Sequence, residues 1–476
     1  MATKYHQISL TETFSDCQNM FIDESPSFFQ ILSDHFDLSD FIPFEFQSAF
    51  YLSVGRNRIY PLHGFLSAFI LQKIFSIPTD SLLLLFLNIC EELRVFCGFS
   101  KVPDASLMSR FKHDFEPYIE LMFQQMVDYT EPICQLIDSS LAQMLTFDTS
   151  GIELYVTENN PKTLNALIKK LKAFYKDKPD VDPYKMAYGL MPSQAAASSD
   201  AKQMYINGHF CYADKFAILT NGLGIVRHIA FLDDADFKSS HPELVVEKKS
   251  DSPDEDKSVG DASSLVPVLS DFFGLHPDFH PDIFLGDSSF DSAELYGSLF
   301  KDFHFSKALI PYNPRNEGSL KKVGYNEYGY PTCPNDSSLA MKYHGITNEK
   351  GRADRIKWGC PMMSYHKGWI CNCQNPCSTA SRGRTTYTYE NMDLRMFPGI
   401  QRDSEEWNGT YKIRTIVERA INHFKINMCI AGRKTRNHTT TKADVFLAGI
   451  ASQLTVIVAH DMNCPQYIRS LKPLVA

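Results

Sequence analysis

The sequence predicts an α/β protein with a helical N-terminal part, and three features of the chain support this. Residues from about 27 to 125 carry apolar side chains at helical spacing, as in "HGFLSAFILQKIF". From about residue 145 the pattern changes to short apolar runs typical of strands, separated by helical segments. The length of 476 residues exceeds that of one compact domain, so we expect two or three.

The predicted N-terminal helices end in a helix–turn–helix pattern. Gly98 lies in the turn, and Asp104 or Ser106, after Pro103, is predicted to cap the helix that follows. Such a pair is compatible with DNA binding, and equally with a helical bundle that only packs.

Three predicted strands come next. "QMLTFDTSGIELYV" contains Asp148, and "HFCYADKFAILT" and "GIVRHIAFL" are joined by "NGLG", a hairpin turn signal. The helix "DASSLVPVLSDFFGL", the strand "PDIFLGDSSFDS" ending at Asp287, the helix "AELYGSLFKDF" and the strand "FSKALIPYN" follow. An antiparallel meander that feeds parallel strands through helical crossovers is the element order of an RNase H-like fold.

The helix "TIVERAINHFK" would complete such a core. Between it and the last strand lie about 90 residues rich in Gly, Pro, Cys, Tyr and Arg, which we interpret as an insertion. We predict four parts. Residues 1–135 form a helical N-terminal domain that binds DNA ends, and residues 140–315 form the first part of the core, with an acidic loop at 248–262. Residues 316–405 form a Cys-rich, β-containing insertion, and residues 406–476 complete the core and add a C-terminal helix.

Composition limits the functional class. The N-terminus has no secretory signal, and the apolar stretches "SLLLLFLNIC" and "VFLAGIASQLTVIVAH" are predicted to be too short to span a bilayer. We therefore expect no membrane partner and reduced cysteines. The net charge of −9 does not itself favour nucleic acid, but "YKIRTIVERAINHFKINMCIAGRKTR" is locally basic, as phosphate contact requires.

Three carboxylates would converge in an RNase H-like core. Asp148 lies on the first strand, Asp287 ends a neighbouring strand, and Glu418 lies on the late helix. Phosphodiester cleavage uses two Mg²⁺ ions about 3.5–4 Å apart, and Mg²⁺ prefers oxygen ligands. The pattern predicts that these three residues hold metal.

Each carboxylate also has an ordinary explanation. Asp148 suits a turn, and Asp287 suits a helix N-cap, which would leave Asp291 as the functional acid. Glu418 could pair with Arg414, four residues earlier.

The late helix carries a more specific pattern. Arg414, Glu418 and Lys425 are spaced by 4 and 7, so they are predicted to share one helix face. A carboxylate between two cations suits a metal-bound phosphate. With Tyr411 they satisfy the pattern Y-x2-R-x3-E-x6-K, and the chain resembles the bacterial insertion-sequence DDE transposases of the tyrosine–arginine–glutamate–lysine group.

Further segments carry the same resemblance. They are "PDASLMSRFKHDF", "FDTSGIELYVTENNP", "YINGHFCYADKFAILTNGLGIVRHIAF", "LGDSSFDSAEL" and "FPGIQRDSEEWNGTYKIRTIVERAINHFK". Together they cover most of the chain from about residue 30 to 460.

The resemblance implies a bacterial, cytoplasmic and nucleoid-associated transposase that cleaves the ends of an insertion sequence and joins the 3′-OH ends to target DNA. Asp148, Asp287 and Glu418 would be catalytic and bind two Mg²⁺ ions, which Mn²⁺ could replace. Tyr411, Arg414 and Lys425 would contact phosphate, Tyr411 being equally suited to packing. The partners would be terminal inverted repeats and target DNA, bound by a homodimer. The alternatives are a catalytically silent, transposase-derived DNA-binding protein and an RNase H-like nuclease without strand transfer.

The insertion holds a possible zinc site. Thiolates are good Zn²⁺ ligands, and we favour a set of four, with Cys373 and His366 as spares: Cys333, Cys360, Cys371 and Cys377. A bound zinc ion would stabilise an insertion that we expect to lack a hydrophobic core of its own. The cysteine spacing C-x-C-x3-C is irregular, however, and free thiols explain these cysteines equally well. The basic run at 169–178 could lie on phosphates or form a solvated helix, and Trp407 could stack on a base or pack.

Overall fold

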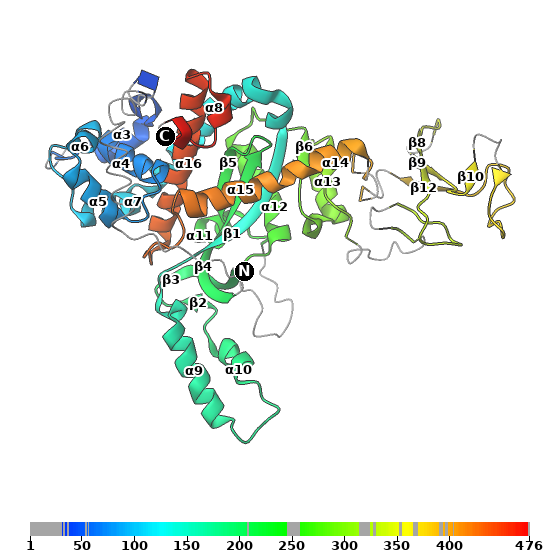
Figure 1. Cartoon of the computed structure of the whole chain (residues 1–476), viewed down its shortest axis with the longest axis horizontal. Coiled ribbons are helices and arrows are strands. Elements are labelled where there is room, and N and C mark those ends of the chain that lie inside the picture. The colour runs from blue at the N-terminus through cyan, green and yellow to red at the C-terminus, as the bar shows by residue number, and fades with distance from the viewer. Residues whose placement is uncertain are drawn as a thin grey trace. The chain divides into compact units, whose positions relative to one another are not determined.

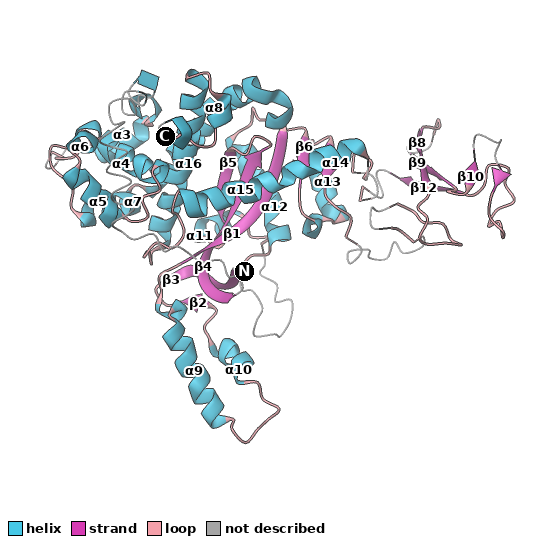
Figure 2. Cartoon of the chain, in the orientation of Figure 1, coloured by secondary structure: helices cyan, strands magenta, loops and turns pink. Residues whose placement is uncertain are grey.

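The computed structural model is a mixed α/β protein, which confirms the predicted class (Figures 1 and 2). It describes residues 31, 34–35, 38–52, 55, 57–206, 209–244, 258–313, 324–326, 330–351, 355–364, 370–389, 394–395, 398–402 and 404–474. The chain forms two compact units. Unit 1 comprises Met1–Ser139, Thr149–Gly260 and Glu418–Ala476, and unit 2 comprises Ser140–Asp148 and Asp261–Val417.

The N-terminal part is helical, as predicted. Its elements are η1 (Leu38–Phe41), α3 (Phe44–Phe50), α4 (Leu62–Ile74), α5 (Asp80–Ile89), α6 (Glu91–Phe96), α7 (Ala105–Asp114) and α8 (Glu116–Ala142). Asp104 caps α7 by accepting a 2.8 Å hydrogen bond from the Ser106 amide, which confirms one of the two predicted caps. Gly98 makes the turn before it with φ +67°. Phenylalanines such as Phe65 and Phe111, stacked at 4.7 Å, fill the space between these helices.

The long C-terminal helix α16 (His438–Asp461) lies in the core of unit 1, beside the N-terminal helices (Figure 1). Its buried Asp444 pairs with Lys73 of α4 at 3.0 Å and with Lys112 of α7 at 3.2 Å. Arg433 lies 3.2 Å from the same carboxylate. Burial raises the pKa of Asp444, but these cations outweigh it and hold the pKa below its ordinary value. The ion pairs tie α16 to the helices at the start of the chain.

Helix α16 corrects one expectation from the sequence. The apolar stretch that we predicted to be too short for a membrane belongs to a helix of 24 residues, and an 18-residue window of it has a mean hydropathy of 1.5. Within the described ranges it is the one helix with the length and composition to cross a membrane, but 94% of that window is buried inside the protein. Such burial is typical of a core helix.

The main sheet has the order β2-β3-β4-β1-β6-β7, with β5 paired to β4. Its strands are β1 (Met144–Glu153), β2 (Gln194–Ala195), β3 (Ser198–Ile206), β4 (His209–Asn221), β5 (Val226–Phe231), β6 (Ile283–Leu285) and β7 (Lys307–Leu309). In unit 1, β4 and β5 form the predicted hairpin, whose turn contains Gly224 at φ +81°. The antiparallel strands β2 and β3 were not predicted. The short helix α11 (Ala235–Ser240) follows β5.

The strands of the main sheet that lie in unit 2 are parallel. The first half of β1 pairs with β6, and β6 pairs with β7. Helices α12 (Asp261–Leu275) and α13 (Ala293–Lys301) are the connections between strands, as the sequence predicts. Met144, Leu285 and Leu309 from the three strands pack with Ile400 and Trp407 in one apolar cluster.

The predicted insertion, residues 316–405, contains two small antiparallel β-sheets that are separate from the main sheet. Strands β8 (Lys342–Thr347), β9 (Arg355–Gly359) and β12 (Thr385–Tyr389) make one antiparallel sheet, and β10 (Met363–Ser364) pairs with β11 (Ile370–Cys371). Trp358 is fully buried against Tyr330, Met341 and Ile356, and its indole nitrogen donates to the Thr388 hydroxyl at 2.9 Å. The insertion therefore has an apolar core of its own, contrary to our expectation.

Candidate active site

The first two predicted acids lie on, or just after, neighbouring parallel strands of unit 2. The register pairs Thr146 of β1 with Leu285 of β6. Asp148 lies two residues after Thr146, in the middle of β1, and Asp287 lies two residues after Leu285, just beyond the end of β6. Asp148 is half-buried and Asp287 is exposed. The parallel register therefore places both residues two positions after the last pair of β1 and β6.

Asp287 lies just beyond its strand and not within it. Strand β6 ends at Leu285, and the Asp287 carboxylate accepts hydrogen bonds from the amide and the hydroxyl of Ser288, at the start of η3 (Ser288–Phe290). Asp287 thus caps a short 3-10 turn, whereas the next α-helix, α13, is capped by Ser292 and not by Asp287. Capping the turn leaves the Asp287 carboxylate exposed, so capping and metal binding are compatible.

The alternative acid, Asp291, has a different environment. Its side chain is fully buried, and Arg395 lies 2.6 Å from one carboxylate oxygen. The same oxygen accepts the backbone N–H of Asn313 at 2.7 Å, and Arg402 is 3.8 Å from the other. A carboxylate held by two guanidinium groups in a closed core is an internal ion pair. Asp291 therefore joins α13 to the segment before the last helices.

The predicted late helix is a run of four elements with different pitch. They are α14 (Glu405–Tyr411), the 3-10 turn η6 (Lys412–Arg414), α15 (Thr415–Asn422) and the π-helix η7 (His423–Asn427). Glu418 lies on α15 and is exposed. Because Arg414 lies in a 3-10 turn and Lys425 in a π-helix, the uniform helical spacing that we assumed does not hold across the run.

Lys425 links η7 to the strand that carries the first aspartate. Its ammonium donates a 3.0 Å hydrogen bond to the hydroxyl of Ser150, within unit 1. Burial lowers the pKa of Lys425. Because alternate residues of a strand share a face, Ser150 and Asp148 point to the same side of β1. Sequence reasoning missed Ser150; the available signal was its place two residues after Asp148, in "DTSG".

Tyr411 and Trp407 pack in unit 2. Their rings are stacked at 5.6 Å, and Trp407 is buried in the apolar cluster of β1, β6 and β7. The structure therefore favours packing for Trp407. Tyr411 is half-buried, and the guanidinium of Arg414 lies 5.9 Å from its ring centre. A phosphate contact by Tyr411 or Arg414 stays a prediction.

The proposed zinc ligands fall in the insertion. Cys333 and Cys360 are buried and Cys377 is half-buried, while the side chain of Cys371 and the whole of His366 lie outside the described residues. None of the cysteines that the structure describes forms a disulfide. Zinc binding by this set stays a prediction.

Metal binding by the three acids also stays a prediction. Within the part of the chain that the structure describes, no group of three or more His, Cys, Asp or Glu side chains forms a candidate metal site. Asp148 and Asp287 belong to unit 2, and Glu418 is the first residue of the last segment of unit 1. Hard carboxylate oxygens are the donors that Mg²⁺ prefers, so the residue types fit the metal.

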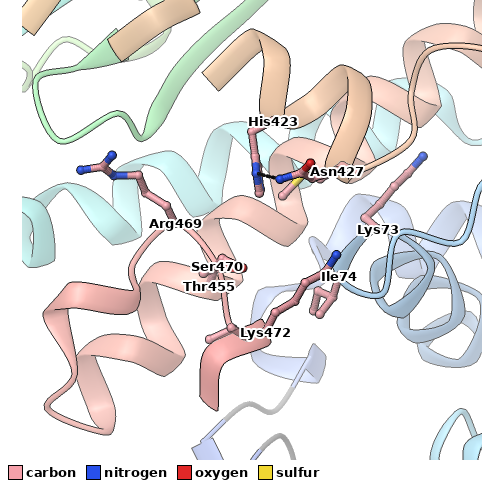
Figure 3. Close-up of a pocket in the computed structure, with 10 residues that line it drawn as sticks. Lys73, Ile74, His423, Asn427, Thr455, Arg469, Ser470 and Lys472 are labelled. Atoms are coloured by element: carbon pink, nitrogen blue, oxygen red, sulfur yellow. Dashed lines mark hydrogen bonds between the residues drawn. The ribbon is translucent and has the colours of Figure 1, made fainter. Parts of the chain in front are cut away.

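A small basic recess lies elsewhere in unit 1 (Figure 3). Lys73, His423, Arg469 and Lys472 are among its lining residues, and His423 is hydrogen-bonded to Asn427 at 3.1 Å. Burial lowers the pKa of His423, and Lys472 lowers it further. The cavity volume of about 10 Å³ is room for about one water molecule, so the recess is too small for a nucleotide substrate.

Comparison with known proteins identifies a class for the N-terminal part. Residues 16–114 match the model of the family described as "Transposase domain (DUF772)". The match supports a transposase, which is a DNA-processing enzyme with DNA as its partner. No curated protein and no solved structure matches the chain.

Proposed function

We propose that this protein is a DDE transposase with an RNase H-like core, which cleaves the ends of an insertion sequence and joins the freed 3′ ends to target DNA. Asp148, Asp287 and Glu418 are the proposed catalytic carboxylates. The observation that carries the proposal is the hydrogen bond between Lys425 and Ser150, because it joins a residue seven positions after Glu418 to a residue two positions after Asp148.

Three further observations support it. The sheet order β5-β4-β1-β6-β7, with β6 and β7 parallel to β1, is the order expected of an RNase H-like core. Asp148 and Asp287 each lie two residues after the last paired residues of the adjacent strands β1 and β6. The match to a transposase domain at residues 16–114 adds the functional class.

The proposed chemistry has two steps. In the first, the oxygen of a water molecule bonds to a phosphorus at the end of the element, the bond from phosphorus to the 3′ oxygen breaks, and that oxygen takes a proton. In the second, the freed 3′ oxygen attacks a phosphorus of target DNA, and the target's own 3′ oxygen leaves. One phosphodiester bond breaks for each that forms, so strand transfer needs no external energy source.

The side chains divide this work. The three carboxylates would hold two Mg²⁺ ions, or Mn²⁺ in their place, and such a pair activates the attacking oxygen and stabilises the leaving one. Arg414 and Lys425 would contact phosphate oxygens, as guanidinium and ammonium groups do at phosphoryl-transfer sites. A homodimer would hold two DNA ends together for joining.

The experiment is a cleavage assay on DNA that contains the terminal sequences flanking the gene, with Mg²⁺ present. We expect the wild type to nick the end and Glu418→Gln to lose the activity by roughly 10³-fold or more, since it removes a group that binds the charged transition state. Glu405→Gln is the matched control, because Glu405 is an exposed carboxylate on the same helical run. It should cut normally.

The outcomes separate the candidates. If Glu418→Gln cuts as well as the wild type, the assignment of Glu418 is wrong. If the wild type and the variant both bind the ends and neither cuts, the catalytically silent DNA-binding protein is favoured. Cleavage without joining to target DNA would indicate a nuclease that lacks the strand-transfer step.

A further inference from the structure

Two helices extend from the sheet of unit 1 as a separate arm (Figure 1). They are α9 (Pro161–Phe174) and α10 (Pro183–Leu190), which follow η2 (Thr157–Asn159), and we call residues 161–190 the arm. Asn160 caps α9 and Asp182 caps α10, each before a proline at the start of the helix. The arm is thus a defined helical hairpin inserted between β1 and β2.

The arm is basic in an acidic protein. Residues 161–185 contain seven lysines and three aspartates, a net charge of +4, whereas the whole chain has a net charge of −9. All of these lysines are exposed: Lys162, Lys169, Lys170, Lys172, Lys176, Lys178 and Lys185. Positive charge is therefore concentrated where it is accessible to a large anionic partner.

The lysines of α9 gather on one side of the helix. Lys162 and Lys169 are seven residues apart, which is about two turns and roughly 10.5 Å along the axis, so they share a face. Lys170 and Lys172 flank that face. The apolar residues of α9 lie on the opposite side: Leu164, Leu167, Ile168, Leu171 and Phe174.

The apolar side is partly used within the arm. Ile168 is buried, and the Lys172 ammonium donates a 2.8 Å hydrogen bond to the Tyr184 hydroxyl of α10. The same ammonium lies 4.5 Å from the centre of the Tyr184 ring. These contacts orient α9 on α10, which leaves the lysine face towards solvent.

We infer that this lysine face binds the phosphate backbone of duplex DNA. A helix about 10–12 Å in diameter fits the major groove, about 12 Å wide, or lies along its edge, and ammonium groups on one face then meet successive phosphates. The contacts read no sequence and position the protein on DNA. Two copies of the arm, each at +4, repel each other, so a second arm is a poorer partner than a phosphate backbone.

The test measures binding to a 40-base-pair duplex of random sequence by fluorescence anisotropy, in EDTA, from about 50 to 200 mM salt. The variant Lys162→Gln, Lys169→Gln, Lys170→Gln leaves the Lys172–Tyr184 contact intact. We expect its affinity at the lowest salt to fall by at least about ten-fold, and the slope of log K against log salt to become shallower by about 1 to 3. Replacing the same three lysines by arginine should preserve both values.

The matched control removes the same number of positive charges from surfaces outside the arm. Lys101→Gln, Lys301→Gln, Lys350→Gln removes three exposed lysines outside the arm and should bind within about two-fold of the wild type. Equal losses in the two triple variants would show a general charge effect and overturn the inference. A change of oligomeric state in the arm variant, with unchanged DNA affinity, would assign the arm to self-association and also overturn it.

The inference rests on the proposed function only in requiring that the chain binds DNA. If the wild type binds the duplex through the arm but never cuts the ends of the element, only the proposed transposase activity is contradicted. If the wild type cuts the ends and the arm variant keeps the DNA affinity and salt slope of the wild type, only the proposed DNA binding by the arm is contradicted. Absence of DNA binding by the wild type would contradict both.

Discussion

Two aspartates four residues apart show how far side-chain environment decides a role. Asp287 is exposed and caps a short turn, while Asp291 is fully buried between Arg395 and Arg402. Sequence alone left both open as the functional acid. An exposed carboxylate at a strand end can bind a metal ion, whereas a buried one already held by guanidinium groups cannot leave them without a large cost.

The pair predicts opposite effects for the same substitution. Asp291→Asn removes the charge that compensates Arg395 and should destabilise the protein by roughly 3 kcal/mol, since breaking a buried ion pair leaves one charge unpaired. Asp287→Asn should leave stability nearly unchanged, because Asn also serves as an N-cap, but should abolish cleavage. Urea denaturation and the cleavage assay read the two effects. Loss of stability in Asp287→Asn with normal cleavage would reverse the two roles.

At the scale of elements, packing decides where the sequence pattern is ambiguous. Helix α16 has the length and hydropathy of a membrane span, yet its residues are buried against the N-terminal helices and the sheet of unit 1. Gly449 marks one such contact, since a Cβ there would lie 2.7 Å from ring carbons of Phe123. Phe123 is itself fully buried, so neither partner has space to move.

Gly449→Ala should therefore destabilise the protein by roughly 1–3 kcal/mol, because overpacking outweighs the higher helix propensity of alanine. Gly297→Ala is the matched control. Gly297 lies within α13, and a Cβ there would meet no atom within 4 Å. That change should stabilise the protein by about 0.5–1 kcal/mol. If both substitutions stabilise in thermal denaturation, α16 is not packed against Phe123 as described.

The late helical run shows a limit of periodicity. We placed Arg414, Glu418 and Lys425 on one face by assuming a uniform α-helix, but η6 and η7 interrupt it. The Met428 amide bonds to the carbonyl of His423, five residues back, which is the π pattern. Apolar spacing in the sequence does not distinguish a π turn from an α turn, so the partner of Lys425 emerged only from the structure.

Over the whole molecule, the sequence predicted the elements with strong local patterns. The helix from Asp261 to Leu275, the β4–β5 hairpin and the cap at Asp104 are present as expected. Strand β3 was missed because "SSDAKQMYI" is polar in its first half and so lacks the apolar alternation of a strand. Hydrogen bonding to β4 stabilises the strand despite this weak local pattern. The core of the insertion was missed because Tyr330, Met341 and Trp358 are too far apart in sequence to form a local signal.

The candidate site was predictable in part for the same reason. The element order is a local feature that placed Asp148 and Asp287 on or after neighbouring strands, and each follows the last pair of β1 and β6 by two residues. The link between Lys425 and Ser150 joins residues 275 positions apart, and no spacing rule reaches across that distance.

Asp148, Asp287 and Glu418 are proposed to hold two metal ions together, and diffraction tests this most directly. Crystals of the protein with its end DNA, grown in Mn²⁺, should give two anomalous peaks about 3.5–4 Å apart, in contact with the carboxylates of all three residues. The metal site would be contradicted by Mn²⁺ bound elsewhere, or by the three carboxylates lying more than about 10 Å apart, since ions at that spacing could not bridge them.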